Sequence, residues 1–167
     1  MPAARHQVTI RRPASEVFGY LADGLNGPKW RTGILDIAHI SGNGVGATYK
    51  QGVKGPGGRR IDADYRVTTY EPNSRLAFEA IAGPVRPTGE YLLEEVDGAN
   101  RLTFELHAEL SGIKKLLMGG AVQKTMDSEV AASDRLKTIL ESAPKAQAGA
   151  ERLLPALGAR VRRIPAP

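Results

Sequence analysis

The sequence predicts an α+β fold, in which a curved antiparallel sheet of seven strands packs against one long C-terminal helix, with two short helices after the first strand. Three observations support this prediction. Apolar and polar residues alternate through most of residues 7–110, short turns rich in Gly, Pro, Asn and Asp separate the alternating runs, and after Gly112 the apolar period changes from two to about 3.6 residues. Short turns favour antiparallel pairing, because parallel strands need long crossover connections.

The first elements are one strand and one helix. In RHQVTIRR, Val8 and Ile10 alternate with polar residues, which indicates a strand. PASEVFGYLADG follows, with Val17, Phe18 and Leu21 at helical spacing. A proline at its start and a glycine after its end are typical helix boundaries.

The segment DGLNGPKWRTGI contains the only tryptophan of the chain, Trp30, in a stretch whose composition is that of a turn or short helix. A large indole is costly to leave in water, so we expect Trp30 to be largely buried, closing one end of the core or roofing a cavity. We expect Gly27 and Pro28 to shape the bend, and Lys29 and Arg31 to face solvent.

Six strand-like runs come next. They are ILDIAHIS, ATYKQGVK, RRIDADYRVTTYE, RLAFEAIA, TGEYLLEEV and NRLTFELHAEL. The segments between them, such as SGNGVG, GPGG, PNS and DGA, have hairpin chemistry. In the last run Leu102, Phe104 and Leu106 alternate with polar residues, which indicates one buried and one solvated face.

A long helix is predicted from Ile113 to Ser142, with one apolar stripe. Its members are Leu116, Gly119, Val122, Met126, Val130, Ser133 and Leu140. A sheet with one apolar face needs a cover, and this helix is the only predicted element long enough to supply it.

This order of elements resembles the START-like helix-grip superfamily (SRPBCC), in particular its polyketide cyclase/dehydrase-type members. RRPASEVFGYLADGLNGPKW looks like the opening motif of that superfamily, GNGVGATYKQ like its glycine-rich strand entry, and TGEYLLEEVDGANRLTFEL like its closing hairpin. The resemblance covers nearly all of a domain predicted to span residues 1–142. It implies an internal, mostly apolar cavity between the sheet and the last helix.

Alternation and the helix stripe indicate which side chains would line such a cavity. The predicted ligand-binding residues are Trp30, Tyr65, Val67, Phe78, Tyr91, Leu93, Phe104, Val122, Met126 and Val130. For each one, the competing interpretation is that it simply fills a core. Tyr65 and Tyr91 are the polar members, so they are also the candidates for catalysis, although no catalytic residue is assigned.

Other chemistry finds little support in the sequence. Gly42, Gly44 and Ala47 fit a dinucleotide-binding spacing, but the alternating run ATYKQGV follows them where that motif needs a helix, so a turn is the better interpretation. The three histidines are dispersed, and neither a metal nor a cofactor is predicted. Asp62 and Asp64 share one strand face, which we expect to point outward.

The net charge of +5 is concentrated in residues 143–167, where five cationic residues stand against Glu151 alone. This Ala/Pro-rich end is predicted to be a flexible basic tail. Nucleic-acid binding is not predicted, because aromatic residues are not interleaved with the basic ones; a weak contact of the tail with a membrane surface stays open. Without cysteine, a signal-like segment or a transmembrane segment, the chain is expected to be cytoplasmic.

The predicted function is binding of a small hydrophobic ligand, such as a lipid, an isoprenoid or a polyketide-like molecule. One alternative is an enzyme of the cyclase/dehydratase type, and a second is a non-catalytic protein-interaction module, which would need an exposed apolar patch. The sequence predicts neither the identity of the ligand nor the oligomeric state.

Overall fold

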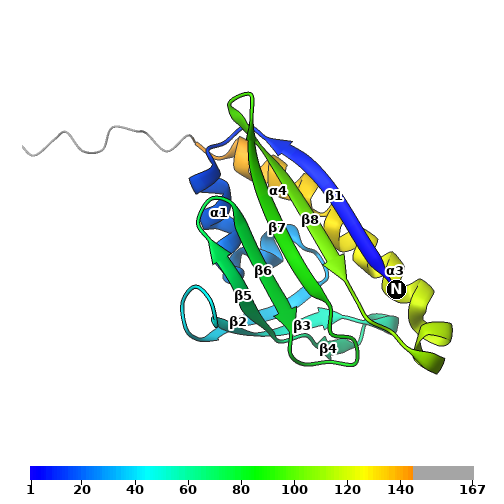
Figure 1. Ribbon diagram of the computed structural model, residues 1–167. Coiled ribbons are helices and arrows are strands. Elements are labelled where there is room, and N and C mark those ends of the chain that lie inside the picture. Colours follow the sequence, from blue (N-terminus) through cyan, green and yellow to red (C-terminus); the bar gives the residue numbers. More distant parts are fainter. Residues whose placement is uncertain (145–167) are drawn as a thin grey trace, which may run out of the picture.

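The computed structural model describes residues 1–144, in which one curved sheet is covered on its concave face by helices (Figure 1). The predicted tail therefore lies, apart from its first two residues, outside the described residues. The elements are β1 (Ala3–Ile10), α1 (Ala14–Ala22), η1 (Gly24–Asn26), α2 (Gly27–Trp30), β2 (Ile34–Ser41), β3 (Thr48–Lys54), η2 (Pro56–Gly58), β4 (Arg60–Asp62), β5 (Tyr65–Glu71), β6 (Arg75–Ala80), β7 (Thr88–Val96), β8 (Ala99–His107), α3 (Gly112–Ala131) and α4 (Ser133–Ser142).

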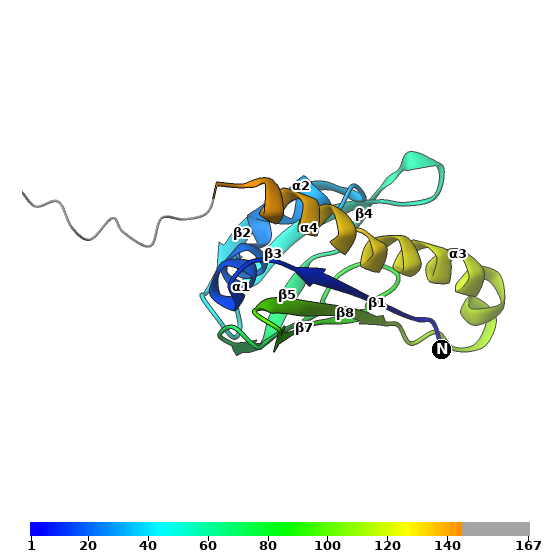
Figure 2. The ribbon, with the colours of Figure 1, turned by 90° about the horizontal axis from the view of Figure 1, so that it is seen from above.

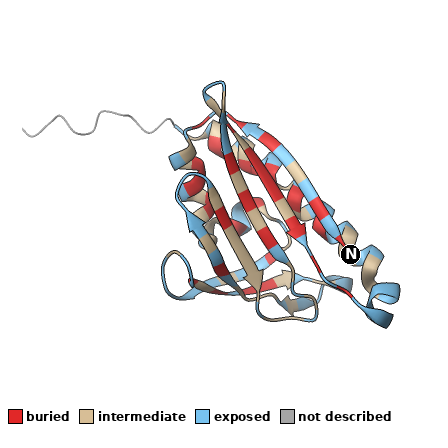
Figure 3. Cartoon of the chain, in the orientation of Figure 1, coloured by how far each residue is buried: buried red, intermediate tan, exposed pale blue. Residues whose placement is uncertain are grey.

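The strands lie in the order β1-β8-β7-β6-β5-β3-β2, with β4 paired to β3, and every pair is antiparallel. Seen from above, α3 and α4 run along one face of this sheet (Figure 2). Buried residues alternate with less buried ones along the strands (Figure 3). The predicted fold class is confirmed: an α+β fold in which a curved antiparallel sheet grips the C-terminal helices.

The sheet has eight strands rather than the seven predicted, because the run RRIDADYRVTTYE is divided into β4 and β5. Asp64 causes the interruption. Its carboxylate accepts a hydrogen bond from the Gln51 backbone N–H at 3.0 Å, so a side chain replaces a backbone carbonyl in the ladder with β3. The chain leaves β3 at this point, and β5 resumes the pairing at Tyr65.

The predicted long helix is present over residues 112–142 but breaks at Ala132. Ser133 is fully buried, and its hydroxyl donates a hydrogen bond to the Val130 carbonyl. Such a local side-chain bond competes with regular helical pairing. Both α3 and α4 contact β1, and they lie on the same face of the sheet.

Buried side chains pack together at the end of the molecule where α1 and α4 lie. Trp30 is 3% exposed, and its indole meets the rings of Tyr91 and Phe104 edge-on at 6.2 and 6.1 Å. The buried guanidinium of Arg12 donates from Nε to the Leu140 carbonyl at 2.7 Å, which satisfies a free carbonyl at the C-terminus of α4. The prediction that Trp30 is largely buried is confirmed.

Candidate functional site

A cavity of about 660 Å³ lies between the concave face of the sheet and α3. Its walls come from the inward side chains of β3, β5, β6 and β7, and its roof from α3 and the segment after α2. Exposed residues such as Lys54, Pro84 and Lys124 belong to the lining, so the cavity opens to solvent between α3, the β3–β4 hairpin and the β6–β7 loop. We call this opening the mouth.

A continuous row of aromatic rings crosses the concave face, one ring from each of five strands. The row is Tyr49, Tyr65, Phe78, Tyr91 and Phe104, with successive centroids 4.9, 5.5, 5.8 and 4.5 Å apart. The outer two rings at one end, Tyr49 and Tyr65, are stacked at an interplanar angle of 11°. All of these rings except Phe104 belong to the cavity lining, so the row makes one wall of the cavity largely aromatic.

Two glycines make room for the row. A Cβ at Gly89 would lie 2.1 Å from the Phe78 ring, and a Cβ at Gly24 would lie 2.2 Å from the Tyr65 hydroxyl oxygen. Any larger residue at Gly89 would displace Phe78 from its place between Tyr65 and Tyr91. The aromatic wall therefore depends on positions that carry no side chain.

Arg31, directly after α2, and Glu129 form an ion pair in the cavity lining. Nε of Arg31 donates to Oε2 of Glu129 on α3 at 2.5 Å, and the two side chains are only 13% and 16% exposed. Burial acts to lower the pKa of Arg31, but the Glu129 carboxylate outweighs it and holds that pKa above its ordinary value. The prediction that Arg31 faces solvent is wrong, because this carboxylate lies opposite it; Lys29 is exposed as predicted.

The two phenols predicted as candidates remain neutral over a wide pH range. Burial raises the pKa of Tyr91 to about 12, although the nearby Arg31 cation acts to lower it. Burial also raises the pKa of Tyr65 above its ordinary value. A phenol in this state can donate a hydrogen bond or a proton at neutral pH, but it is a poor source of phenolate.

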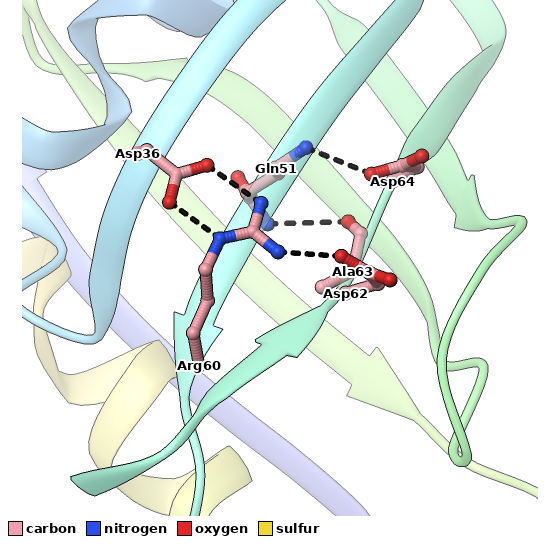
Figure 4. A network of polar contacts seen from close by, with 6 residues as sticks. All are labelled: Asp36, Gln51, Arg60, Asp62, Ala63 and Asp64. Atoms are coloured by element: carbon pink, nitrogen blue, oxygen red, sulfur yellow. Dashed lines mark hydrogen bonds and ion pairs between the residues drawn. The ribbon is translucent and has the colours of Figure 1, made fainter.

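Gln51 places a polar group in the same cavity. The residue is 4% exposed and lies on the inward side of β3 with Tyr49 and Val53. Its Nε2 donates to the Ala63 carbonyl at 3.4 Å (Figure 4), while its Oε1 is buried without a hydrogen-bond partner. A buried acceptor without a partner is unfavourable, so this oxygen is available to a donor brought by a ligand or by water.

The opposite face of β3 carries a separate ion network (Figure 4). Arg60 donates to both carboxylate oxygens of Asp36 at 2.6 and 2.8 Å and to Asp62 at 2.5 Å. The hydrogen bond from Arg60 lowers the pKa of Asp36. Because Gly52 has no side chain, this network lies directly over β3 and ties β4 to β2 on the outside.

The structure divides the ten predicted binding residues into two groups. Six of them line the cavity: Tyr65, Val67, Phe78, Tyr91, Val122 and Met126. The other four lie in the core beside it: Trp30, Leu93, Phe104 and Val130. Whether the first group contacts a ligand stays a prediction. Asp62 is exposed and accepts a hydrogen bond from Arg60. The expectation that Asp64 points outward is wrong, because it is half-buried and accepts a hydrogen bond from the Gln51 backbone.

Gln51, Arg31 and Glu129 are among the polar members of the lining that sequence reasoning missed. Gln51 could have been found, since it alternates inward between Tyr49 and Val53. Arg31 and Glu129 are 98 residues apart in sequence, and no spacing rule brings them together. Only the position of Glu129 three residues after Met126 on the helix stripe hinted at an inward direction.

The histidines lie apart in the structure. His6 contacts Asp134 at 2.9 Å, His39 contacts the Gly42 carbonyl at 2.7 Å, and His107 is exposed on β8. Within residues 1–144, no group of three or more His, Asp or Glu side chains is placed to hold a metal ion. The Gly42–Ala47 segment is a turn between two strands.

A curved antiparallel sheet that grips C-terminal helices around a largely apolar cavity is the helix-grip architecture. The family model described as polyketide cyclase/dehydrase and lipid transport matches residues 1–141. The chain therefore belongs to this family, and the resemblance seen in the sequence is confirmed.

Individual proteins and solved structures also resemble this chain. An uncharacterised protein of Mycobacterium tuberculosis, Rv2574, is 29% identical over 112 residues, which is 65% of this chain and 66%, slightly less than two thirds, of the relative. A START superfamily protein from Mycobacterium smegmatis superposes with a TM-score of 0.68 at 14% identity, covering 83% of this chain and 97% of its own. The Zhui aromatase/cyclase from Streptomyces sp. R1128 superposes with a TM-score of 0.60 at 18% identity, covering 83% of this chain and 90% of its own. At these identities the solved structures show a shared fold.

No helix within residues 1–144 combines the length and the apolar character needed to cross a lipid bilayer.

Proposed function

We propose that this protein binds a small, largely apolar molecule in the cavity beneath α3. The observation that carries the proposal is the cavity itself: about 660 Å³, open at one end and walled mainly by apolar and aromatic side chains. Sites for small ligands commonly enclose about 300–1,000 Å³ and combine such walls with a few polar groups. An aromatic wall makes favourable edge and stacking contacts with a ligand that itself carries aromatic rings.

The polar groups of the lining define what the ligand carries besides its apolar skeleton. The unpaired Oε1 of Gln51 calls for a donor, such as a hydroxyl group, at that end of the cavity. The neutral phenol of Tyr91 and the cation of Arg31 offer donors to an oxygen elsewhere in the lining. The proposed ligand is therefore a hydroxylated apolar molecule of lipid, isoprenoid or polyketide-like type.

Calorimetric titration with two matched probes tests this proposal. 2-Naphthol and 2-methoxynaphthalene share a planar apolar skeleton and one oxygen, but only the first can donate a hydrogen bond. We expect both to bind one-to-one, with 2-naphthol about fivefold tighter, the ratio that one net hydrogen bond supplies. In Gln51→Leu the ratio should fall close to one.

Gln123→Leu is the matched control, because Gln123 lies on α3 outside the cavity lining and pairs with the Ala3 backbone. This variant should keep the ratio of the wild type. If neither probe saturates the wild-type protein, the proposed function is wrong. If both bind but Gln51→Leu keeps the fivefold preference, the apolar cavity stands and the role given to Gln51 is wrong.

A second candidate function is catalysis of the cyclase/dehydratase type. The observation that favours it is the neutral Tyr91 phenol beside the Arg31–Glu129 pair, where a donor and a cation could together stabilise negative charge developing on a carbonyl oxygen of a bound substrate. A linear poly-β-ketone thioester, with products followed by mass spectrometry, tests this candidate. Turnover that falls at least a hundredfold in Tyr91→Phe would support it, and unchanged turnover would exclude Tyr91.

A cytoplasmic location completes the proposal. Fluorescence microscopy of the tagged full-length chain tests it: signal throughout the cell interior is expected, and signal outside the cytoplasm would contradict it.

A further inference from the structure

The N-terminal end of α3 exposes the most prominent apolar surface among the described residues. Ile113, Leu116 and Leu117 are 75%, 86% and 76% exposed, and we call these three residues the apolar tip. Figures 1 and 2 both show these first turns of α3 extending past the ends of the strands. A group of three large aliphatic side chains exposed on a projecting helix end is typical of an interaction site for an apolar partner.

The helix segment that carries the apolar tip is cationic. From Ser111 to Met126 the chain contains Lys114, Lys115 and Lys124 and neither Asp nor Glu. All three lysines are exposed, and Arg86 is exposed in the β6–β7 loop at the mouth of the cavity. Aliphatic side chains flanked by lysines complement an anionic lipid surface, where the former enter the acyl region and the latter contact the head groups.

The apolar tip also adjoins the mouth. Met118 and Ala121, the next turn of the same helix, already belong to the cavity lining. If this protein bound a membrane through the apolar tip, the mouth of the cavity would lie near the lipid surface. This last point rests on the proposed function, because it gives the contact a purpose: an apolar ligand could pass between bilayer and cavity without crossing bulk water.

We propose that the apolar tip and its flanking lysines dock this protein reversibly on an anionic membrane, with the mouth of the cavity beside the bilayer. A second copy of the chain fits the tip less well, because pairing two tips would bring their lysines together. The basic C-terminal tail carries the same sign of charge and is a poor partner for the same reason.

Co-sedimentation of the full-length chain with vesicles tests the docking. With vesicles of phosphatidylcholine containing about one third phosphatidylglycerol, we expect binding that weakens as salt rises. The double variant Leu116→Glu/Leu117→Glu should reduce the bound fraction about tenfold or more. Leu35→Glu is the matched control: Leu35 is a half-exposed leucine on β2, away from the tip, and its substitution should leave vesicle binding unchanged.

Three results would overturn the proposal. One is vesicle binding that survives the double variant, which would assign it to the basic tail. Another is the absence of vesicle binding in the wild type. The third is a wild-type dimer in size-exclusion chromatography with light scattering that the double variant converts to monomer, which would assign the tip to a second copy. Binding of 2-naphthol by the double variant is read separately, so its loss or retention reports on the cavity and not on docking.

Discussion

The two ends of the C-terminal helical segment differ sharply, although both lie on the same face of the sheet. In α4, Ser133, Leu136 and Leu140 are buried to 3% exposure or less, and Arg12 caps the C-terminus. In the first two turns of α3, the exposed fractions of Leu116 and Leu117 exceed 75%. Figure 3 shows the same contrast, with the projecting end of α3 exposed. We call the α4 end closed and the α3 end open.

This difference indicates which contacts stabilise the fold and which surfaces are free to bind a ligand or a membrane. At the closed end α4 packs buried side chains against the sheet, while the open end leaves the cavity accessible and the apolar tip exposed. Changes at the closed end should therefore alter the free energy of unfolding, and changes at the open end should alter ligand or membrane binding.

The largest expected effect is that of Trp30→Ala at the closed end. It removes an indole that is 3% exposed and packs against two aromatic rings, so the free energy of unfolding should fall by about 3–5 kcal/mol. Urea denaturation measures the change. Because Trp30 lies outside the cavity lining, the affinity of the remaining folded protein for 2-naphthol should change less than threefold. Full stability in this variant would contradict a structural role for Trp30.

A pair of identical substitutions compares the two ends directly. Leu136→Ala removes a fully buried side chain and should cost about 2–5 kcal/mol. Leu116→Ala removes a side chain that is 86% exposed and should change stability by less than about 0.5 kcal/mol. Denaturant midpoints of both variants measure the difference, and equal losses would mean that the open end is packed in solution.

Alkaline pH should lower the free energy of unfolding, because the buried phenol of Tyr91 ionises. Its folded pKa is raised to about 12, so folding favours the neutral phenol, and the resulting stability is present below pH 10 and lost as the pH rises from 10 towards 12. The contribution lost between pH 9 and pH 11 is about 1.4 kcal/mol. Tyr91→Phe should lose correspondingly less stability over this range. Tyr70→Phe, at an exposed tyrosine on β5, should behave as the wild type does.

The smallest expected effect concerns acid pH at the closed end. The Arg11 backbone N–H donates to Glu141 at 2.9 Å and lowers the pKa of that carboxyl. A depressed folded pKa contributes stability above the unfolded pKa that is lost as the pH falls through the folded one. Glu141→Gln should therefore lower the melting temperature slightly at pH 7 and not at pH 3. An equal decrease at both pH values would show that the charge of Glu141 does not matter.

The fold followed from the sequence because its signals are local. Alternation, turn composition and the change of period after Gly112 each act over a few residues, and together they predicted the order of elements. The divided strand and the broken helix escaped prediction because each depends on one side-chain hydrogen bond, at Asp64 and at Ser133.

The site was predictable in its apolar and aromatic part. Alternation placed Phe78 and Tyr91 inward, but it could not separate the cavity wall from the filled core, where Phe104 lies. That boundary depends on the distance of α3 from the sheet. The pairing of Arg31 with Glu129 could not be predicted either, because a contact between residues 98 apart in sequence forms only when α3 packs onto the sheet.

The central claim, that the cavity beneath α3 is a ligand site, is tested most directly by ¹H–¹⁵N NMR of the full-length chain titrated with 2-naphthol. We predict saturable shifts that are largest at Gln51, Phe78 and Met126, with Leu136 and Leu140 at the closed end nearly unmoved. Shifts that do not saturate, or that are confined to exposed residues outside the cavity lining, would contradict the claim.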